Sequence, residues 1–531
     1  MESREKRGQF FRAALCLVMV IVVTRGVSLT HNFLNTPDEH VFTFSTETLL
    51  DSLLSGEQYE PYKPYPEGTY VFRLPFQLLA RHVALTEDYS VNVRIWGRIA
   101  SVFYYTLGAL LGLWLVQDPL RGGRAGMRIY VPAIGFGLFQ IEQSRYGTFD
   151  PVSFPLVMLI IASTVCWLRK GRLPWLLGAA FCAGAAAAGK YPLAYFFLLP
   201  AAALFLRGDL RRKRLPVLAA MALCLLGGFL LFSPSVVLNP GFLALTIKKE
   251  LLGYAVNGNP EGYSTPPESA LSTLLYHLLY ADLPLAPLWA AAYVGRTCKG
   301  GETDAERRFC FRTVPAVSLG FLAYNLFVKT FFFRTLFPWF CVSLLYASAG
   351  LAAFCRDKKR RAAAVLLCVL MIGRGALLLS LLGDRDGGQT AAASLAESVS
   401  GCEIDEVVAM GGYFQQAAFS GGLPMPTKTI GIDKLYEGQF PALEPGTLLV
   451  TDSIEGGWVK PYVFPIRDGR VRNMLEGWER FKTENADCLR AKLYPDWIYP
   501  AFGYRLHGST ATNYEFPANW LYYRPMAVRE K

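Results

Sequence analysis

Residues 35–44 read NTPDEHVFTF and follow the first long apolar run of the chain, Phe11–Leu29. The adjacent carboxylates Asp38 and Glu39 therefore stand where a membrane helix has just emerged. Ionised carboxylates are costly to desolvate near the hydrocarbon boundary, so an acidic pair there usually faces a wet cavity or a partner cation. Pro37 restricts its own backbone and that of the preceding residue, which favours a fixed direction for the pair. This stretch is either a solvated loop or the beginning of a functional site.

The composition of the whole chain favours a membrane protein. Of its 531 residues, 52% are hydrophobic and 18% are charged, whereas soluble proteins carry roughly 25% charged residues. No small-residue cleavage site follows Phe11–Leu29, so we interpret this run as a retained anchor. The formal net charge of +11 comes from short basic blocks between apolar runs. Such blocks indicate membrane topology, and no nucleic-acid partner is expected.

About eleven apolar runs approach the length that crosses a bilayer as a helix. They are Phe11–Leu29, Ile95–Val116, Ile129–Ile141, Pro151–Leu168, Pro174–Ala188, Tyr191–Leu206, Leu215–Leu238, Leu271–Val294, Val314–Phe327, Phe331–Phe354 and Ala362–Leu382. Basic blocks occupy every second segment between them, beginning with the N-terminus. Because Lys and Arg mark the cytoplasmic side, the N-terminus is predicted to be inside and the alternate loops outside.

This topology divides the chain into two parts. Residues 1–382 are predicted to form a polytopic, mainly α-helical membrane domain, with a long outside loop over residues 30–94. Residues 383–531 are predicted to form an extracytoplasmic soluble α/β domain. We therefore expect an integral, multi-pass protein of the cell membrane, or of the endoplasmic reticulum if the source is eukaryotic.

The first outside loop is long enough to be functional. Apolar residues in Ser45–Leu54 have nearly helical spacing, which predicts a short helix along the membrane surface. Tyr59–Gly68 is rich in tyrosine and proline and is interpreted as a rigid aromatic turn. Val71–Leu85 predicts a second surface helix, from which Arg73 and Arg81 can extend to the headgroups.

The polar C-terminal region shows strand and helix patterns. Glu406–Met410 and Thr447–Asp452 are short apolar runs bounded by turn residues, so they predict strands, and Ala391–Val399 predicts a helix. Gly411-Gly412 is either a plain turn or, less favoured, a phosphate cradle. Most of the eleven cysteines lie within apolar runs or near basic loops. The remaining two, Cys402 and Cys488, lie in this polar region, and the sequence leaves open whether they are bridged.

Charged and aromatic residues gather in the predicted outside segments. Asp150 lies at the outer end of a span, and Lys190 ends the small-residue run Ala183–Gly189, which suits close helix packing. Lys329 and Arg334 flank three phenylalanines. Each cation has two interpretations, a headgroup anchor or a phosphate ligand. Together, the carboxylates, cations and aromatic residues suit a substrate with a lipid tail, a phosphate and a polar head.

The order of these motifs resembles the GT-C class of membrane glycosyltransferases, in particular the protein O-mannosyltransferase and aminoarabinose transferase superfamily. The resemblance covers Phe11 to Phe354 and depends on four segments, Asp38-Glu39, Arg145-Tyr146 with Asp150, Gly189-Lys190-Tyr191 and Phe333-Arg334. Residues 36–40 are also similar to the His-Pro-Asp-Glu motif of lipid-linked mannosyltransferases, with Thr36 in place of the histidine. Residues 383–531 resemble no family that we can name.

The resemblance implies an inverting glycosyltransferase at the extracytoplasmic membrane face. It would transfer a hexose or pentose from a polyprenyl-phosphate donor to a hydroxyl group of a protein, lipid or glycan. Asp38 would be the general base that takes the hydroxyl proton. Glu39 and Asp150 would position the acceptor or bind Mg²⁺ or Mn²⁺ through carboxylate oxygens. Asp38 and His40 are further candidate metal ligands, although a solvated or hydrogen-bonded histidine is the favoured explanation of His40.

The resemblance also implies a cationic site for the donor phosphate. Lys190 and Arg334, together with Lys248 or Lys329, would stabilise the charge that grows on the departing phosphate. Four aromatic residues would contact the acceptor or form its loop: Tyr62, Tyr65, Tyr146 and Tyr191. The identities of the sugar and of the acceptor are left open.

Two other function classes explain less of the sequence. A transporter or flippase of lipid-linked sugars would carry charges at the bilayer midplane and a repeated pair of broken helices. In this chain the charges lie at the ends of the apolar runs. A plain membrane anchor that presents residues 383–531 would leave the acidic outside loops unexplained.

Overall fold

The computed structural model describes most of the helical region and parts of the C-terminal region. The described residues are 2–27, 29, 37–56, 67–145, 147–208, 211–238, 241, 244, 248, 283, 286–298, 304–327, 333–355, 358–383, 404–410, 428–430, 434, 437–441, 443–444, 446–451, 469–485, 489–492 and 520–523. The chain forms two compact units. We call Met1–Leu29, Asp38–Pro267 and His277–Ala376 the helical unit, and Thr30–Pro37, Glu268–Tyr276 and Leu377–Lys531 the C-terminal unit.

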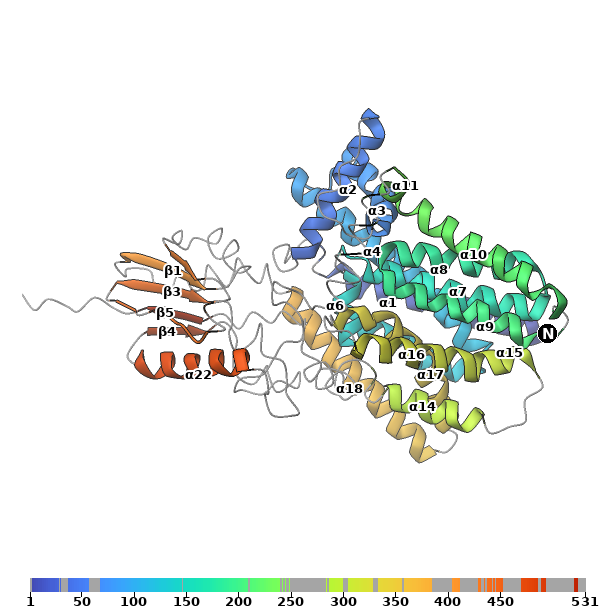
Figure 1. The fold of residues 1–531 in the computed structure, drawn as a ribbon. Helices are drawn as coiled ribbons and strands as arrows, with labels where there is room; N and C mark the ends of the chain where they lie inside the picture. Colours follow the sequence, from blue (N-terminus) through green and yellow to red (C-terminus); the bar gives the residue numbers. More distant parts are fainter. Residues whose placement is uncertain are drawn as a thin grey trace, which may run out of the picture. The chain divides into compact units, whose positions relative to one another are not determined.

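The described chain up to Gly383 is helical (Figure 1). Its α-helices are α1 (Glu2–Gly26), α2 (Pro37–Ser55), α3 (Gly68–His82), α4 (Tyr89–Gln117), α5 (Gly123–Phe136), α6 (Leu138–Arg145), α7 (Asp150–Lys170), α8 (Leu173–Gly189), α9 (Leu198–Leu206), α10 (Arg214–Leu231), α11 (Pro234–Leu238), α14 (Ala286–Thr297), α15 (Ala305–Arg308), α16 (Val314–Phe327), α17 (Phe337–Phe354) and α18 (Lys358–Gly383). Shorter 3₁₀ or π segments cover Tyr191–Phe197, Arg211–Lys213, Phe309–Thr313 and Phe333–Leu336.

Several helices are long and apolar enough to cross a membrane. Among the described residues these are Glu5–Gly26, Tyr89–Gln117, Asp150–Lys170, Arg214–Leu231 and Phe337–Phe354, and the apolar helices Leu173–Gly189 and Tyr191–Leu206 are shorter. The predicted count of about eleven spans is not confirmed. One reason is that the run Ile129–Ile141 is divided into α5 and α6 by Gly137, whose backbone is extended (ψ 131°). Another is that most of Leu271–Val294 lies outside the described residues.

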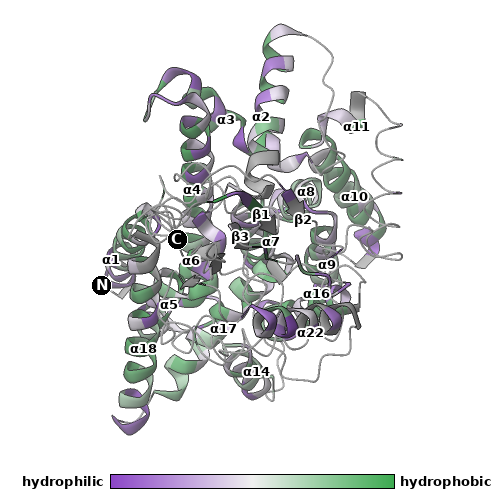
Figure 2. Ribbon diagram, turned by 90° about the vertical axis from the view of Figure 1, so that its left-hand side faces the viewer, coloured by the Kyte–Doolittle hydropathy of each residue, from purple (hydrophilic) through white to green (hydrophobic). Residues whose placement is uncertain are grey.

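The apolar helices differ in how far they are buried within the protein. Helices α7 and α17 are buried over most of their length, and α7 packs against α4 and α8. Helices α1 and α10 expose apolar side chains such as Met19 and Leu223, and Figure 2 shows the hydrophobic character of α10. A helix that is apolar on its exposed side suits a lipid surrounding.

The small-residue run of α8 packs backbone to backbone against α10. A Cβ atom at Gly184 would collide with the carbonyl oxygen of Leu225, and one at Gly228 would collide with that of Phe181. Glycines at these two positions therefore let the helix axes approach closely, as predicted from the sequence.

The two helices predicted in the first outside loop are α2 and α3. Figure 1 shows them with α11 at the end of the helical unit away from the N-terminus. Buried Phe42, Leu49 and Tyr70 form a small core between α2 and α3. Their position at a membrane surface stays a prediction, as does the position of the predicted outside loop.

The described residues after Gly383 include a five-stranded sheet and a helix. The sheet order is β2-β1-β3-β5-β4, with β1 (Glu406–Met410), β2 (Lys428–Ile430), β3 (Thr447–Thr451), β4 (Leu489–Lys492), β5 (Trp520–Tyr523) and α22 (Gly469–Glu484). Strand β1 pairs in parallel with β2 and β3, and β5 pairs antiparallel with β3 and β4.

The two strands predicted from the sequence are confirmed as β1 and β3. Trp478 of α22 is buried and stacks on Phe481 with the ring centroids 5.2 Å apart. The predicted helix Ala391–Val399, the pair Gly411-Gly412 and both Cys402 and Cys488 lie outside the described residues, so the α/β class of the whole unit stays a prediction.

Candidate functional site

A buried ion pair joins the ends of α7 and α8. Asp150 is the first residue of α7, and Lys190 follows α8 with an extended backbone (φ −150°, ψ 113°). The Lys190 ammonium pairs with Oδ1 of Asp150, whose side chain is only 2% exposed, whereas that of Lys190 is 21% exposed. The Thr148 hydroxyl donates a further hydrogen bond to Oδ2 of Asp150 at 3.3 Å. A carboxylate in the first turn of a helix is also stabilised by the helix dipole.

Two glycines allow three chain segments to meet beside this pair. A Cβ atom at Gly189 would collide with the ring of Phe149, and one at Gly68 would lie 2.6 Å from the backbone nitrogen of Gly189. The beginning of α3, the segment before α7 and the turn after α8 are therefore in direct contact. Phe149 and Gly189 immediately precede Asp150 and Lys190 in the sequence, so this contact adjoins the pair, and we call this place the ion-pair site.

Arg73 connects α2 to the ion-pair site. It is 2% exposed, and its guanidinium donates to the carbonyl oxygen of Gly147 at 2.8 Å and to the hydroxyl of Thr43 at 3.2 Å. Gly97 of α4 leaves room for it, because a Cβ atom there would collide with the guanidinium. The expectation that Arg73 extends to the headgroups is therefore wrong. Its charge is buried and bonded inside the protein.

Glu67 is a second buried carboxyl group at this place. It is 1% exposed and immediately precedes Gly68. Its Oε2 accepts a hydrogen bond of 2.7 Å from the backbone N–H of Ser235, at the beginning of α11. Burial raises the pKa of Glu67, and hydrogen bonding by Ser235 opposes part of that rise. Glu67 was not among the predicted site residues, and nothing in the tyrosine- and proline-rich stretch distinguishes it from the nearby Glu60.

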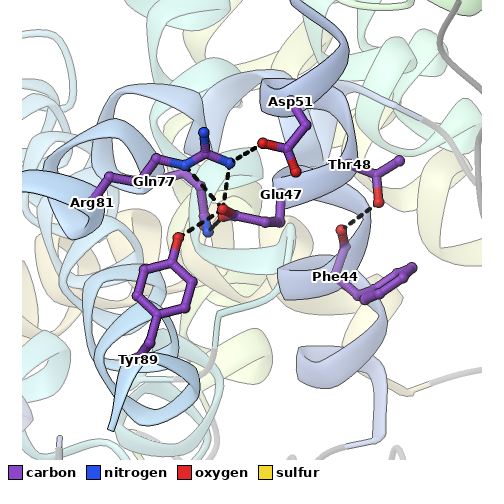
Figure 3. Close-up of polar contacts among 7 residues, drawn as sticks. All are labelled: Phe44, Glu47, Thr48, Asp51, Gln77, Arg81 and Tyr89. Atoms are coloured by element: carbon purple, nitrogen blue, oxygen red, sulfur yellow. Dashed lines mark hydrogen bonds and ion pairs between the residues drawn. The ribbon is translucent and has the colours of Figure 1, made fainter. Parts of the chain in front are cut away.

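A ladder of polar side chains holds α2 beside α3 (Figure 3). Glu47 accepts hydrogen bonds from Gln77 and, at 2.9 Å, from Nε of Arg81, which also pairs with Asp51. Tyr89 of α4 donates to the same Glu47 carboxylate at 2.6 Å. When the contact between Thr43 and Arg73 is included, the bonded residues on each helix are four sequence positions apart. We call Thr43, Glu47 and Asp51 on α2, with Arg73, Gln77 and Arg81 on α3, the polar ladder.

The basic blocks predicted to lie inside meet at the other end of α7. Arg169 bonds to Glu306 at 2.7 Å and pairs with Asp118. Arg207 lies over the ring of Trp167, 5.3 Å from its centroid. The ion-pair site and these basic residues therefore lie at opposite ends of α7. Which end is cytoplasmic stays a prediction.

The structure describes the predicted site residues to different extents. Asp150, Lys190 and Tyr191 lie together, with Tyr191 half-buried, and Lys248 is exposed. Asp38, Glu39 and His40 lie in the first turn of α2, and Arg334 lies in the segment Phe333–Leu336, but the side chains of these four lie outside the described structure. Lys329, Tyr62, Tyr65 and Tyr146 lie outside the described residues altogether.

The described residues do not form a metal centre of the usual kind. Within the searched part of the chain, no three His, Cys, Asp or Glu residues lie close enough to hold a metal ion. The residues predicted as candidate ligands include Asp38, Glu39 and His40, whose side chains are not described. The expected use of Mg²⁺ or Mn²⁺ therefore stays a prediction.

Comparisons with known proteins give structural neighbours only. No protein-family model and no curated protein sequence matches the chain. The crystal structure of ArnT from Cupriavidus metallidurans bound to undecaprenyl phosphate is similar, with 14% identity, 84% of this chain and 92% of that chain covered, and a TM-score of 0.47. The apo state of the same protein gives 14% identity, coverage of 83% and 92%, and a TM-score of 0.45.

The archaeal oligosaccharyltransferase AglB from Archaeoglobus fulgidus, in complex with an inhibitory peptide and a dolichol-phosphate, is also similar. Its identity is 11%, the coverage is 84% of this chain and 69% of that chain, and the TM-score is 0.49. All three TM-scores are below 0.5, and all three sequence identities are below 15%.

Proposed function

We propose that this chain is a membrane glycosyltransferase of the GT-C class. It transfers a sugar from a polyprenyl phosphate to an acceptor hydroxyl at the extracytoplasmic face. The observation that carries the proposal is the ion-pair site, in which a partly exposed lysine is held by a fully buried carboxylate at the end of a bundle of apolar helices. A fixed cation at such a boundary can bind a phosphate whose lipid tail remains in the bilayer.

Lys190 supplies the positive charge for the phosphate. An ammonium group carries three N–H donors, so a lysine can hold Asp150 and a phosphate oxygen together. Asp150 fixes the direction of the ammonium, and charge on the departing phosphate grows as the bond to the sugar breaks. Preorganised electrostatic stabilisation of this kind is usually the largest contribution to such reactions. Arg334, with Lys248 or Lys329, shares the phosphate in this proposal.

Asp38 is the proposed general base, and the position of α2 supports this role. Thr43 of α2 contacts Arg73, which in turn bonds to Gly147, three residues before Asp150. Asp38 lies five residues before Thr43 on the same helix, a distance of roughly 7.5 Å along the axis. The first turn of α2 is therefore connected to the ion-pair site through a short chain of buried contacts.

The reaction is a single displacement. The acceptor oxygen forms a bond to the anomeric carbon, the bond from that carbon to the phosphate oxygen breaks, and the acceptor proton moves to Asp38. The polyprenyl phosphate leaves with the bonding electron pair, and the anomeric configuration inverts. Glu39 positions the acceptor, and the tyrosines predicted in the outside loops line its path. If a divalent cation binds here, it adds positive charge beside the phosphate.

The proposal is tested with purified protein in lipid vesicles. Labelled polyprenyl-phosphate hexose, pentose and aminosugar donors are supplied with candidate acceptors, and both the released lipid phosphate and the transferred sugar are measured. We expect transfer with inversion, and we expect Lys190→Ala to lower turnover about 10²–10³-fold, as for the loss of one transition-state contact. The matched control is Lys170→Ala, in the last turn of α7, with unchanged turnover. Movement of intact donor across the bilayer without release of lipid phosphate would instead identify a flippase.

A further inference from the structure

Basic side chains from separate segments gather at the end of α7 that is opposite the ion-pair site. Residues 207–214 read RGDLRRKR and run from the end of α9 to the first residue of α10. Arg207 packs against the turn between α7 and α8, since a Cβ atom at Gly171 would lie 3.0 Å from a guanidinium nitrogen. Arg172, the next residue of that turn, is exposed. The turn after α7 and the segment before α10 therefore meet.

Backbone carbonyl oxygens at the end of α9 hold two further guanidinium groups there. Arg214 donates to the carbonyl oxygens of Phe205 and Arg207, at 3.2 Å and 3.3 Å. Arg308 of α15 donates to the carbonyl oxygen of Leu206 at 3.4 Å. We call the following six residues, of which the second turn residue and the adjacent pair before α10 are exposed, the basic cluster: Arg172, Arg207, Arg212, Lys213, Arg214 and Arg308.

Three acidic residues at this end bond elsewhere. Asp118 and Glu306 pair with Arg169, and Asp304 accepts a hydrogen bond from the backbone N–H of Glu306 at the beginning of α15. Asp209 lies outside the described residues. Like charges held close together repel one another, and more strongly beside a medium of low dielectric constant. The basic cluster therefore favours an anion from outside the chain.

Exposed apolar side chains border the basic cluster. The Arg214 guanidinium lies over the ring of Phe205, 5.1 Å from its centroid, and Phe205 is 57% exposed. Leu215 is 79% exposed and begins an apolar exposed face of α10 that continues to Leu223 and Leu231. Helix α10 is long and apolar enough to cross a membrane. The cations thus lie at the boundary between a lipid-facing surface and water, where headgroups are found.

We propose that the basic cluster binds the headgroup of an anionic phospholipid of the surrounding bilayer, whose acyl chains lie along α10. Guanidinium groups suit phosphate oxygens because they donate two N–H bonds in parallel. Basic pockets between membrane helices bind anionic headgroups in this way. Other basic blocks, such as residues 358–361 at the beginning of α18, belong to a single helix, whereas the basic cluster joins three segments. The inference is independent of glycosyl transfer, because it concerns the opposite end of α7.

The test measures lipid binding by the purified full chain in detergent micelles, using native mass spectrometry. The double variant Arg212→Gln with Lys213→Gln and the single variant Arg172→Gln are compared with the wild type. The matched control is Lys358→Gln with Lys359→Gln, which removes the same charge from exposed positions of α18. Each protein is titrated with phosphatidylglycerol, which is anionic, and with phosphatidylcholine, which has no net charge. Thermal unfolding without added lipid confirms that all variants are folded.

We expect the wild type to bind phosphatidylglycerol at least about 10-fold more tightly than phosphatidylcholine. One cation near an anionic headgroup contributes roughly fivefold to binding. Arg172→Gln should therefore lose about fivefold in affinity for phosphatidylglycerol, and the double variant at positions 212 and 213 about 10- to 30-fold. The control should keep the affinity of the wild type for both lipids.

Two results would overturn the inference. Equal affinity of the wild type for the two lipids would show that the basic cluster does not select an anionic headgroup. Equal losses in the two double variants would show that only the total positive charge matters. Because no sugar donor enters the assay, either result leaves the proposed glycosyl transfer standing, and failure of sugar transfer would leave the lipid-binding inference standing.

Discussion

Single buried charges determine how the ion-pair site is assembled. Asp150, Arg73 and Glu67 are each almost fully buried, and each bonds to a segment that is distant in the sequence. Burying a charge is costly unless it is paired or hydrogen-bonded. Misplacing any of these segments would leave a charge uncompensated, so these residues favour one arrangement of α3, α7 and α8.

Removing one member of the ion pair should destabilise the protein more than removing both. Loss of one partner from a fully buried pair costs about 3–5 kcal/mol. Because the Lys190 side chain remains 21% exposed, we expect Lys190→Met to cost at most about 3 kcal/mol. The double variant Asp150→Asn with Lys190→Met should recover part of that loss. Unfolding in mild detergent measures the single variants Lys190→Met and Asp150→Asn and the double variant, and purely additive losses in the double variant would contradict the coupling.

Asp38→Asn should lower turnover without affecting the fold. The amide keeps the shape of the carboxylate but cannot take a proton, and a lost general base typically costs about 10²–10⁴-fold. Donor binding, measured by equilibrium dialysis of labelled lipid, should change little. Turnover close to that of the wild type would remove Asp38 from the mechanism and make Asp150 the next candidate base.

The residue types of the site could be predicted from the sequence, but their partners could not. The predicted topology puts Asp150 and Lys190 on the same side of the membrane, and the pattern of charges in the sequence predicts no more than that. Their bond joins residues 40 positions apart, and Arg73 reaches Gly147 across 74 positions. Such pairings depend on how the helices cross, which a single sequence does not determine.

At the scale of helices, glycines set the distances between neighbouring elements. Gly68 and Gly189 let α3 contact the turn after α8, and Gly184 and Gly228 let α8 contact α10. The run of small residues in α8 predicted close packing, but it did not predict which helix would be the neighbour. Helices α2 and α3 were predicted from apolar spacing, whereas the polar ladder between them was not.

Gly68→Ala should lower the stability of the protein, whereas Gly178→Ala should not. A Cβ atom at Gly68 meets backbone atoms of Ala188 and Gly189, which cannot yield as a flexible side chain does. We expect a loss of about 1–3 kcal/mol, as for overpacking, and reduced turnover. Gly178 lies in α8 with nothing within 4 Å of an added Cβ atom, so alanine there should be neutral or stabilising by up to about 1 kcal/mol. Equal unfolding midpoints for the two variants would refute the packing argument.

At the scale of the whole molecule, the charge distribution predicts the orientation in the membrane. The ion-pair site and the basic residues Arg169 and Arg207 lie at opposite ends of α7. The positive-inside rule then predicts that the ion-pair site is outside, and the alternation of basic blocks along the sequence predicts the same for the chain after Gly383. The apolar runs and two of the strands followed from local sequence patterns. The number of spans could not be predicted from these patterns, because the length of an apolar run does not show where a glycine divides a helix.

A cysteine introduced at Ser453 should react with a membrane-impermeant thiol reagent in intact cells. A cysteine at Glu306, among the basic residues at the other end of α7, should react only after permeabilisation. The parent protein measures the reaction of the native cysteines, among which Cys16 is exposed. The reverse pattern would place the C-terminal unit and the ion-pair site in the cytoplasm.

The polar ladder fixes the rotation of α2 about its own axis relative to α3. Its three α2 residues share one face because they are spaced by four, and each residue added to a helix rotates what precedes it by about 100°. One alanine inserted between Phe44 and Ser45 would therefore rotate Asp38, in the first turn of α2, away from its original direction. Glu47 and Asp51, which follow the insertion, would stay bonded to Arg81. We expect that protein to fold and to bind donor but to transfer sugar far more slowly, whereas the same insertion after Ser55, beyond the ladder, should leave transfer intact. The direction of a proposed catalytic side chain would then be encoded in a helix register rather than in the loop that precedes it.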